Sequence, residues 1–260
     1  MIDSHAHVAF DGFDTDRDAV VSRLTPAGVN GWVEIGTDIE QSQKAVDLAQ
    51  RYAHCWASVG VHPSDIALLN NETWAQLEQL VQQPKVVAIG EIGFDFYRGG
   101  SLEEQTKVLT RFAELAYQNK LPMIFHVRDA AGTWNAHEAM IAFLKALPEE
   151  KKPKGVIHTF SGTQEHAEEY LKLGFYLSFS GVVTFPNAGA IAEVARTMPL
   201  DRLLIETDCP FLTPFPHRGK RNEPSYVVFV AQKIAELRHI LLEEVDKVTE
   251  SNTKKLFRLV

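Results

Sequence analysis

Eight short apolar runs, most of them rich in β-branched residues, recur along the chain between longer segments of mixed polarity. Most of these runs are almost continuously hydrophobic and do not alternate cleanly between apolar and polar positions. Such continuity is typical of parallel strands that are buried on both faces of a sheet. The pattern therefore predicts eight parallel strands, within Met1–His7, Trp32–Gly36, Trp56–His62, Val86–Gly93, Pro122–Arg128, Gly155–Phe160, Phe175–Ser180 and Arg202–Asp208.

The segments between these runs carry apolar residues at helical spacing. In Leu102–Asn119, for example, Val108, Phe112, Leu115 and Ala116 fall on one helical face. Two further helices are expected in the tail, over Tyr226–Leu237 and Leu241–Leu256. The other predicted helices lie within Ile39–Tyr52, Trp74–Gln82, Asn135–Ala146, Gln164–Leu173 and Ala188–Thr197.

The repeated alternation of strand and helix indicates an α/β fold with a parallel sheet. Eight such units and a length of 260 residues fit a single (β/α)8 TIM-type barrel domain over residues 1–260. The rival architecture is an open doubly wound sheet, but no Gly-rich phosphate loop follows the first predicted strand, which weakens it. The proline-rich segment Pro210–Pro224 predicts a long ordered loop over one end of the barrel.

Composition narrows the class of protein. The chain has 26 Lys and Arg against 34 Asp and Glu, a formal net charge of −8, which argues against binding nucleic acid or membranes by bulk electrostatics but permits a small basic patch. Two cysteines, Cys55 and Cys209, provide no disulfide framework. No run approaches the roughly 20 apolar residues of a membrane span, and the N-terminus lacks a secretory signal. These features predict a soluble, cytoplasmic protein.

Five of the ten histidines lie at the C-terminal ends of predicted strands: His5, His7, His62, His126 and His158. Active sites of (β/α)8 barrels are built at that end. Because residues two apart on a strand point to the same face, His5 and His7 both aim into the barrel mouth and form half of a divalent-metal site. The other five histidines are expected to be solvated side chains on helices or loops: His54, His137, His166, His217 and His239.

An acidic residue, Glu91, ends the otherwise apolar fourth run. Burial of a carboxylate there is costly unless it binds a cation or hydrogen-bond donors. Two metal ions close together need a bridging oxygen donor, which in some barrels is a carboxylated lysine. Because Lys85, Lys120 and Lys154 precede their strands, they lie at the opposite face of the barrel, and Glu91 remains as the natural bridge.

The expected site therefore holds two divalent ions, and Mg²⁺, Mn²⁺ and Zn²⁺ all suit its donors. Asp208, at the end of the last strand, is expected to ligate one ion and to accept the proton of the nucleophilic water, so Asp208 and Glu91 are the predicted catalytic residues. Glu206 either pairs with an arginine in the barrel core or replaces Asp208 as the base, and Glu34 is expected to be structural. The predicted metal ligands are His5, His7, Glu91, His126, His158 and Asp208.

Six motifs at these positions closely resemble those of the TatD family of metal-dependent hydrolases, within the amidohydrolase superfamily. This resemblance implies a divalent-metal deoxyribonuclease, often a 3′→5′ exonuclease on single strands, and it assigns the metal to the same six residues. Ile92 departs from the Cys or Thr that relatives often carry, at a position with no catalytic role. The motifs are His5–His7, Gly60–Pro63, Gly90–Asp95, His126–Asp129, His158–Gly162 and Glu206–Pro210, followed by Arg221–Pro224.

Phosphodiester hydrolysis also needs donors that hold the phosphates of the substrate. The predicted substrate-binding residues are His62, Arg128, Lys220 and Arg221, with Arg98 and Arg218 as further candidates. Aromatic side chains can stack the bases of a single-stranded DNA substrate. The candidates for stacking are Phe94, Phe96, Phe211 and Phe215.

Two other functions are compatible with the same residues. One is metal-dependent hydrolysis of an amide, ester or lactone in a small substrate, or of the ester in aminoacyl-tRNA, with an apolar rather than a basic pocket. The other is a catalytically silent barrel that binds nucleic acid or protein partners. The presence of every expected ligand argues against the silent barrel.

Overall fold

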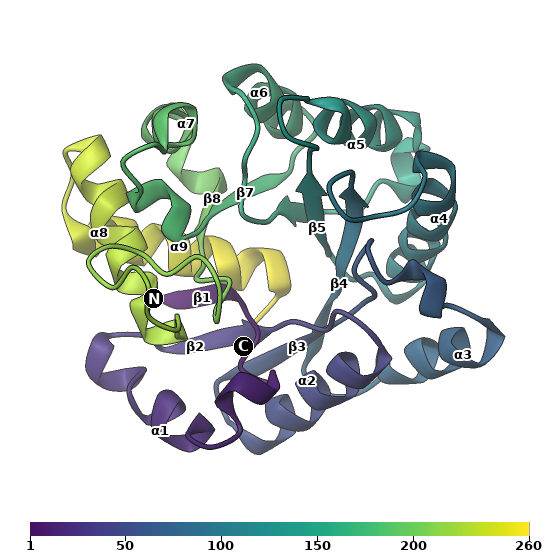
Figure 1. Cartoon of the computed structure of the whole chain (residues 1–260), viewed down its shortest axis with the longest axis horizontal. Helices are drawn as coiled ribbons and strands as arrows, with labels where there is room; N and C mark the ends of the chain where they lie inside the picture. The colour runs from purple at the N-terminus through teal and green to yellow at the C-terminus, as the bar shows by residue number, and fades with distance from the viewer. Residues whose placement is uncertain (260) are drawn as a thin grey trace.

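The computed structural model describes residues 1–259 and arranges eight parallel strands in one sheet. The strands follow chain order, each paired with the next, and Figure 1 shows them in a ring with the helices around it. The predicted (β/α)8 barrel is therefore confirmed. The strands are β1 (Ile2–Ala6), β2 (Gly31–Glu34), β3 (Cys55–Val59), β4 (Val86–Asp95), β5 (Met123–Arg128), β6 (Gly155–Ile157), β7 (Tyr176–Phe179) and β8 (Leu203–Ile205).

Every predicted run overlaps a strand. β2 and β3 begin one residue before their predicted runs, and several strand ends differ from the prediction at the barrel mouth. β4 continues to Asp95, because it stays paired with β5 as far as Arg128. β6 and β8 are three residues long, so His158 and Asp208 lie on the loops that follow them rather than within the strands. Because these loop residues are outside the hydrogen-bonded sheet, other contacts must hold their side chains in place.

A single backbone bridge, between Ala6 and Cys209, joins the end of the chain's first strand to the loop after β8. At this seam the N–H of His7 donates to the carbonyl of Cys209, and the N–H of Asp208 donates to the carbonyl of His5, each at 3.0 Å. The seam therefore runs through three of the predicted metal ligands.

The helices agree closely with the sequence pattern. α4 covers Leu102–Asn119 as predicted, because Ser101 and Glu104 form a capping box at its start. α1 (Arg17–Ser22) was not predicted, since six residues are too few to display a helical period. Within residues 1–259, every helix is too short or too polar to cross a bilayer. The other helices are α2 (Ile39–Arg51), α3 (Asn71–Leu80), α5 (Asn135–Ala146), α6 (Gln164–Lys172), α7 (Gly189–Thr197), α8 (Val227–Arg238) and α9 (Leu242–Phe257).

Two apolar clusters hold the barrel together. The larger one packs the outward-facing side chains of the strands against the surrounding helices. The smaller one fills the barrel interior, and Leu256 and Phe257 of α9 pack against it. α9 also contacts β1 and β8, so it closes the N-terminal end of the barrel and leaves the C-terminal end for the polar site. The interior residues of this cluster are the strand residues Val33, Ala88, Ile124, Val156, Tyr176 and Leu204, together with Ile35 directly after β2.

Candidate metal centre

The six predicted metal ligands meet at the C-terminal mouth of the barrel, where all are buried or nearly so. Glycine 93 makes part of this convergence possible. Its φ is +142°, and a Cβ at Gly93 would lie 2.1 Å from the carbonyl oxygen of His126, so only glycine lets β4 and β5 approach this closely. That approach brings Glu91 of β4 beside His126 of β5.

The two carboxylate oxygens of Glu91 face two different pairs of histidines. Oε1 lies 2.6 Å from His126 Nδ1 and 2.9 Å from His158 Nε2. Oε2 lies 3.4 Å from His5 Nε2 and 3.9 Å from His7 Nε2. Glu91 thus lies between the pairs, as a bridging carboxylate must.

Asp208 approaches His5 and His7 from the loop after β8. Its Oδ1 lies 3.2 Å from His7 Nε2 and 3.6 Å from His5 Nε2. The φ of Asp208 is +54°, in the left-handed region that costs a non-glycine residue of order 1 kcal/mol. The backbone bond from Asp208 to His5 at the seam helps to hold this conformation.

The spacing of the donor atoms is compatible with a bound metal ion. His5 Nε2 and His7 Nε2 are 3.2 Å apart, and so are His126 Nδ1 and His158 Nε2. Two nitrogen ligands on one ion at about 2.1 Å would lie about 3.0–3.4 Å apart in octahedral or tetrahedral geometry. The Nδ1 atoms of His5 and His7 are buried with no hydrogen-bond partner. A set of imidazoles and carboxylates of this kind suits a divalent cation.

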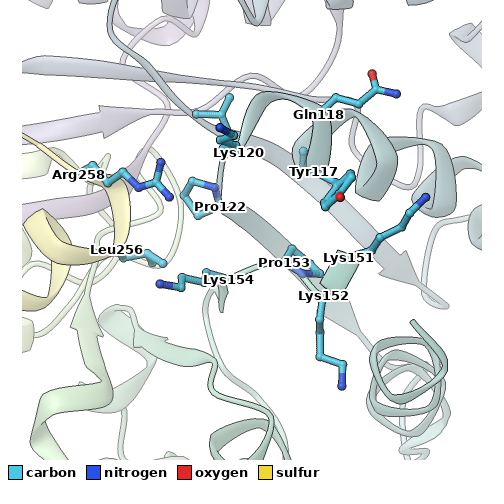
Figure 2. A pocket seen from close by; sticks show the side chains of 12 residues that line it. Tyr117, Gln118, Lys120, Pro122, Lys151, Lys152, Pro153, Lys154, Leu256 and Arg258 are labelled. Carbon is cyan, nitrogen blue, oxygen red and sulfur yellow. The ribbon is translucent and has the colours of Figure 1, made fainter. Parts of the chain in front are cut away.

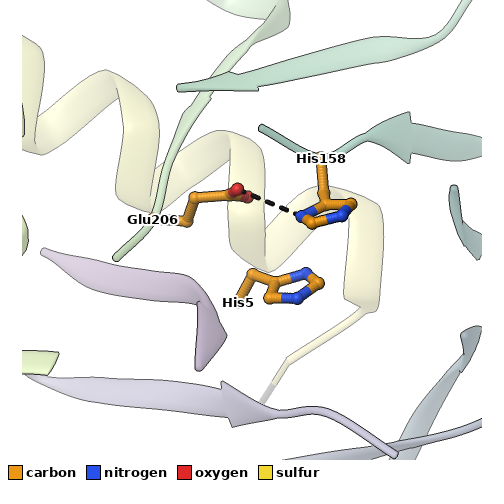
Figure 3. A group of neighbouring side chains, drawn as sticks. All are labelled: His5, His158 and Glu206. Atoms are coloured by element: carbon orange, nitrogen blue, oxygen red, sulfur yellow. Dashed lines mark hydrogen bonds and ion pairs between the residues drawn. The ribbon is translucent and has the colours of Figure 1, made fainter. Parts of the chain in front are cut away.

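A second layer of carboxylates orients two of the histidines. Glu206 Oε1 lies 3.3 Å from His158 Nδ1 and accepts the N–H of Thr159 at 2.7 Å. Figure 3 shows that Glu206 meets the Nδ1 side of His158, while His5 stacks on the imidazole at a centroid distance of 4.0 Å. This contact directs His158 Nε2 toward Glu91, the arrangement expected behind a metal-bound histidine.

Asp95 plays the corresponding part for His126. Its Oδ2 lies 3.3 Å from His126 Nε2, which leaves His126 Nδ1 to face Glu91. Oδ1 of Asp95 accepts the backbone N–H groups of Tyr97 and Arg98 at 2.7 Å each, so the carboxylate is fixed. No role was predicted for Asp95 from the sequence. Its position on the same strand as Glu91, four residues further along, could have indicated that it lies beside the site.

All three buried carboxylates behind or between the histidines are held ionised. Burial raises the pKa of Glu91, but the charge of His158 and hydrogen bonds from His126 and His158 outweigh it and keep the pKa well below its usual range. Burial likewise opposes ionisation of Glu206, and contacts with His158 lower its pKa to about 2. For Asp95, the contact with His126 and the hydrogen bond from the Arg98 amide outweigh burial and lower the pKa to about 2.

The alternative that Glu206 pairs with an arginine is not what the structure shows. Within residues 1–259 its only ion-pair partner is His158. Glu34 is structural as expected, because it accepts the N–H groups of Val8 and Ala9 and the indole N–H of Trp32. These bonds anchor the loop that leaves His7.

His62 enters the site with a defined tautomer. Its Nδ1 accepts the backbone N–H of Ser64 at 3.1 Å and lies 2.7 Å from Ser64 Oγ. Burial lowers the pKa of His62 to about 4, so the neutral ring carries its proton on Nε2. Nε2 lies 3.7 Å from Glu91 Oε1. A ring that donates from Nε2 is a hydrogen-bond donor for a ligand rather than a metal ligand.

A cavity of about 620 Å³ opens above the ligands. Two arginines, Arg98 and Arg128, supply its positive charge, and Phe10 and Phe211 contribute aromatic surface. The Arg128 guanidinium lies over the ring of Tyr97, at 4.2 Å from its centroid. The cavity therefore combines two cations and two aromatic rings with four carboxylates, of Asp65, Glu91, Asp95 and Asp208.

The three cations of the predicted loop Pro210–Pro224 do not line this cavity, although Phe211 and Leu212 of the same loop do. Arg221 is engaged elsewhere, since its guanidinium pairs with Asp16 at 2.6 Å and donates to the Gly12 carbonyl. Lys220 is exposed outside the lining, and the Arg218 guanidinium lies 3.9 Å from the ring centroid of Phe185. The contacts of Arg221 and Arg218 could not be read from charge along the sequence. Of the predicted cations, Arg128 and Arg98 line the cavity.

Three further expectations concern aromatic and histidine side chains. Phe94 is buried in the core and cannot stack a base, whereas Phe211 is 53% exposed at the cavity. Phe215 is exposed but lies outside the cavity lining. The expectation of a solvated His137 was wrong: this histidine is fully buried, with Nδ1 3.1 Å from the hydroxyl of Tyr170.

A family model described as TatD related DNase matches residues 2–258. The chain belongs to the TatD family. Uncharacterized metal-dependent hydrolase YabD of Bacillus subtilis (strain 168) is 42% identical over 260 residues, which cover 100% of this chain and 99% of the relative. The 3′-5′ ssDNA/RNA exonuclease TatD of Cronobacter turicensis is 37% identical over 264 residues, covering 99% of this chain and 97% of the relative.

The solved structures agree with this assignment. The crystal structure of YJJV, the TatD homologue of Escherichia coli K12, superimposes with a TM-score of 0.90 at 30% identity and covers 100% of this chain and 98% of that one. A TatD family hydrolase of Entamoeba histolytica, which is 24% identical, has the same fold: it superimposes with a TM-score of 0.84 and covers 99% of this chain and 97% of that one. This TatD family member is a metal-dependent hydrolase that acts on ester bonds.

Proposed function

We propose that the chain, as one domain over residues 1–260, is a 3′→5′ exonuclease on single-stranded DNA with two divalent ions, Mg²⁺, Mn²⁺ or Zn²⁺. The observation that carries this proposal is the cavity itself, which combines the ligand cluster with Arg98 and Arg128 beside it. A phosphodiester brings negative charge to that place, and two arginines can hold it. A relative that is 37% identical is named a 3′-5′ ssDNA/RNA exonuclease, which supports the same substrate class.

The ligand geometry divides the site into two halves. His5, His7 and Asp208 would hold one ion, and His126 and His158 the other, with Glu91 shared between them. When bound, the divalent ions supply positive charge that polarises a phosphoryl oxygen.

The remaining steps fall to the chain's own side chains. Asp208 accepts the proton of the attacking water, and the Nε2–H of His62 donates to an oxygen of the scissile phosphate. Arg98 and Arg128 hold the phosphates on either side. Phe10 and Phe211 stack the terminal bases, which have no partner strand.

Digestion of a labelled DNA oligonucleotide tests the proposal. We expect the purified protein with Mg²⁺ or Mn²⁺ to shorten a single strand from its 3′ end and to release mononucleotides, and we expect a chelator to abolish the reaction. A duplex of the same sequence, blunt at both ends, is the matched control. If a small lactone, ester or amide is hydrolysed faster than DNA, the result would instead favour a hydrolase of small substrates.

A second experiment tests the phosphate contacts. We expect the double change Arg98→Ala and Arg128→Ala to weaken oligonucleotide binding and to flatten its salt dependence. Each lost phosphate contact removes about 0.7 from the slope of log affinity against log salt for a single strand. Lys220→Ala, which removes an exposed charge outside the cavity, is the control and should change neither quantity by a comparable amount. An unchanged slope in the double variant would place the phosphate contacts elsewhere.

A further inference from the structure

A second pocket, of about 380 Å³, lies at the end of the barrel opposite the metal centre. It is built by the end of α4, the residues that lead into β5 and β6, and the end of α9. Because the strands are parallel, the residues before β5 and β6 lie at the N-terminal face, and the ligands lie at the C-terminal face. The pocket is therefore separate from the proposed active site.

Positive charge distinguishes this pocket from the rest of an acidic chain. Five of its twelve lining residues are cations and none is an acid. Lys151 pairs with Glu114 at 3.0 Å and Lys152 with Glu149 at 2.6 Å. The other three cations have no ion-pair partner among residues 1–259: Lys120, Lys154 and Arg258.

The ends of two helices partly offset this charge. Lys120 caps α4 and Arg258 caps α9, both in the left-handed conformation with φ of +54° and +53°. The C-terminus of a helix carries a partial charge of about −0.5. Two helix ends therefore cancel about one of the three unpaired positive charges, and a net positive charge remains for a bound anion.

The three unpaired cations lie toward one side of the pocket, and Tyr117 lies toward the other with the Lys151 ammonium 5.5 Å from its ring centroid (Figure 2). Figure 2 shows Arg258, Lys120 and Lys154 gathered around Pro122, with Tyr117 beyond Pro153 on the other side. Leu121, Leu256 and the two prolines supply apolar wall, and the ring of Tyr117 is 46% exposed. The volume falls within the range of about 300–1,000 Å³ that small-molecule sites occupy.

We propose that this pocket binds a nucleoside phosphate, with Lys120, Lys154 and Arg258 on the phosphate and the Tyr117 side of the pocket against the base. Arginine and lysine together provide charge-assisted donors to phosphate oxygens, and an exposed aromatic ring offers a stacking surface for any base. The apolar wall favours a ligand with a base over a bare anion. The site does not depend on the activity proposed for the opposite end of the barrel.

Calorimetric titration with dAMP tests the proposal. We expect one dAMP to bind at this pocket in protein treated with a chelator, and we expect the double variant Lys154→Ala, Arg258→Ala to bind it at least about tenfold more weakly, since each lost charged hydrogen bond has an effect of that size or more. Inorganic phosphate should bind more weakly than dAMP, and deoxyadenosine should not bind measurably.

A matched control removes the same charge from elsewhere on the surface. The double variant with Lys107→Ala and Lys247→Ala also loses two exposed cations, neither of which lines the pocket. It should bind dAMP like the unaltered protein. Digestion of the oligonucleotide in the absence of added nucleotide should be equal in all three proteins, so a failure here is distinct from a failure of the proposed nuclease activity.

Two results would overturn the proposal. One is equal dAMP affinity in the unaltered protein and the Lys154→Ala, Arg258→Ala variant. The other is a variant that loses oligonucleotide affinity but keeps its dAMP affinity, because this surface would then bind a nucleic-acid strand and not a nucleotide. Circular dichroism and the unchanged digestion rate establish that the variants are folded.

Discussion

Replacing Glu91 by alanine is expected to remove most of the bound divalent metal and nearly all hydrolytic activity while the barrel stays folded. The reason is geometric, since Glu91 is the side chain whose two oxygens face both histidine pairs. Loss of groups that merely orient metal ligands typically costs 10- to 100-fold in metal affinity or activity, so loss of a shared ligand should cost at least about 100-fold. Elemental analysis after gel filtration, with circular dichroism alongside, measures the effect.

Glu91→Gln is the informative companion to this variant. It keeps the volume and one carbonyl oxygen but cannot present a charged oxygen to each pair, so its metal content should fall between that of the unaltered protein and Glu91→Ala. A surface change such as Glu193→Ala removes a carboxylate far from the histidines and should leave the metal content unchanged. Full metal content in a folded Glu91→Ala protein would rule out the bridging role.

Asp208→Asn is expected to lower turnover by at least about 100-fold, the usual contribution of a general base. Asparagine is nearly isosteric and retains an oxygen toward His7, so substrate binding should change much less than turnover. The measurements are kcat and KM on a DNA oligonucleotide, together with bound metal at saturating supply. The split between kcat and KM separates loss of a proton acceptor from loss of the ion.

Near-normal turnover in Asp208→Asn would contradict this role for Asp208. Glu206, the alternative base considered from the sequence, could not easily replace it. Its Oε1 already faces His158 Nδ1 and accepts both the N–H and the hydroxyl of Thr159, and the side chain is fully buried. Glu206→Gln should therefore act through the orientation of His158, with a loss of metal rather than a selective loss of turnover.

Most of the fold and of the metal site could be predicted from two features of the sequence: the continuous apolar runs and the polar residues at their ends. A strand buried on both faces appears in the sequence as a continuous apolar run. A histidine or carboxylate at the end of such a run is easy to recognise. That is why the eight strands and the convergence of His5, Glu91 and His158 could be anticipated. The order of the strands then followed from the way parallel strands with helical crossovers close into a barrel.

Long-range pairing of polar side chains could not be anticipated in the same way. Arg221 looked free in the sequence, but its partner Asp16 lies 205 residues away along the chain. His137 looked like a surface residue of a helix, but the helix turns it toward Tyr170. The supporting contact from Asp95 to His126 depends on β4 extending beyond Gly93, which apolar patterning did not indicate.

The narrow seam between β1 and the loop after β8 links metal binding to the stability of the closed barrel. Seven of the eight strand junctions are ladders of two or more paired residues, whereas this one has a single bridge with His5 and His7 on one side and Asp208 on the other. An ion bound by all three would connect the end of β1 to the loop after β8. Binding energy gained only in the closed ring stabilises that ring by mass action. Such an ion would add to the seam's own bonds, in which Asp3 accepts the N–H of Thr207 and Ser4 donates to the carbonyl of Ile205. It would then support the closed ring as well as the reaction.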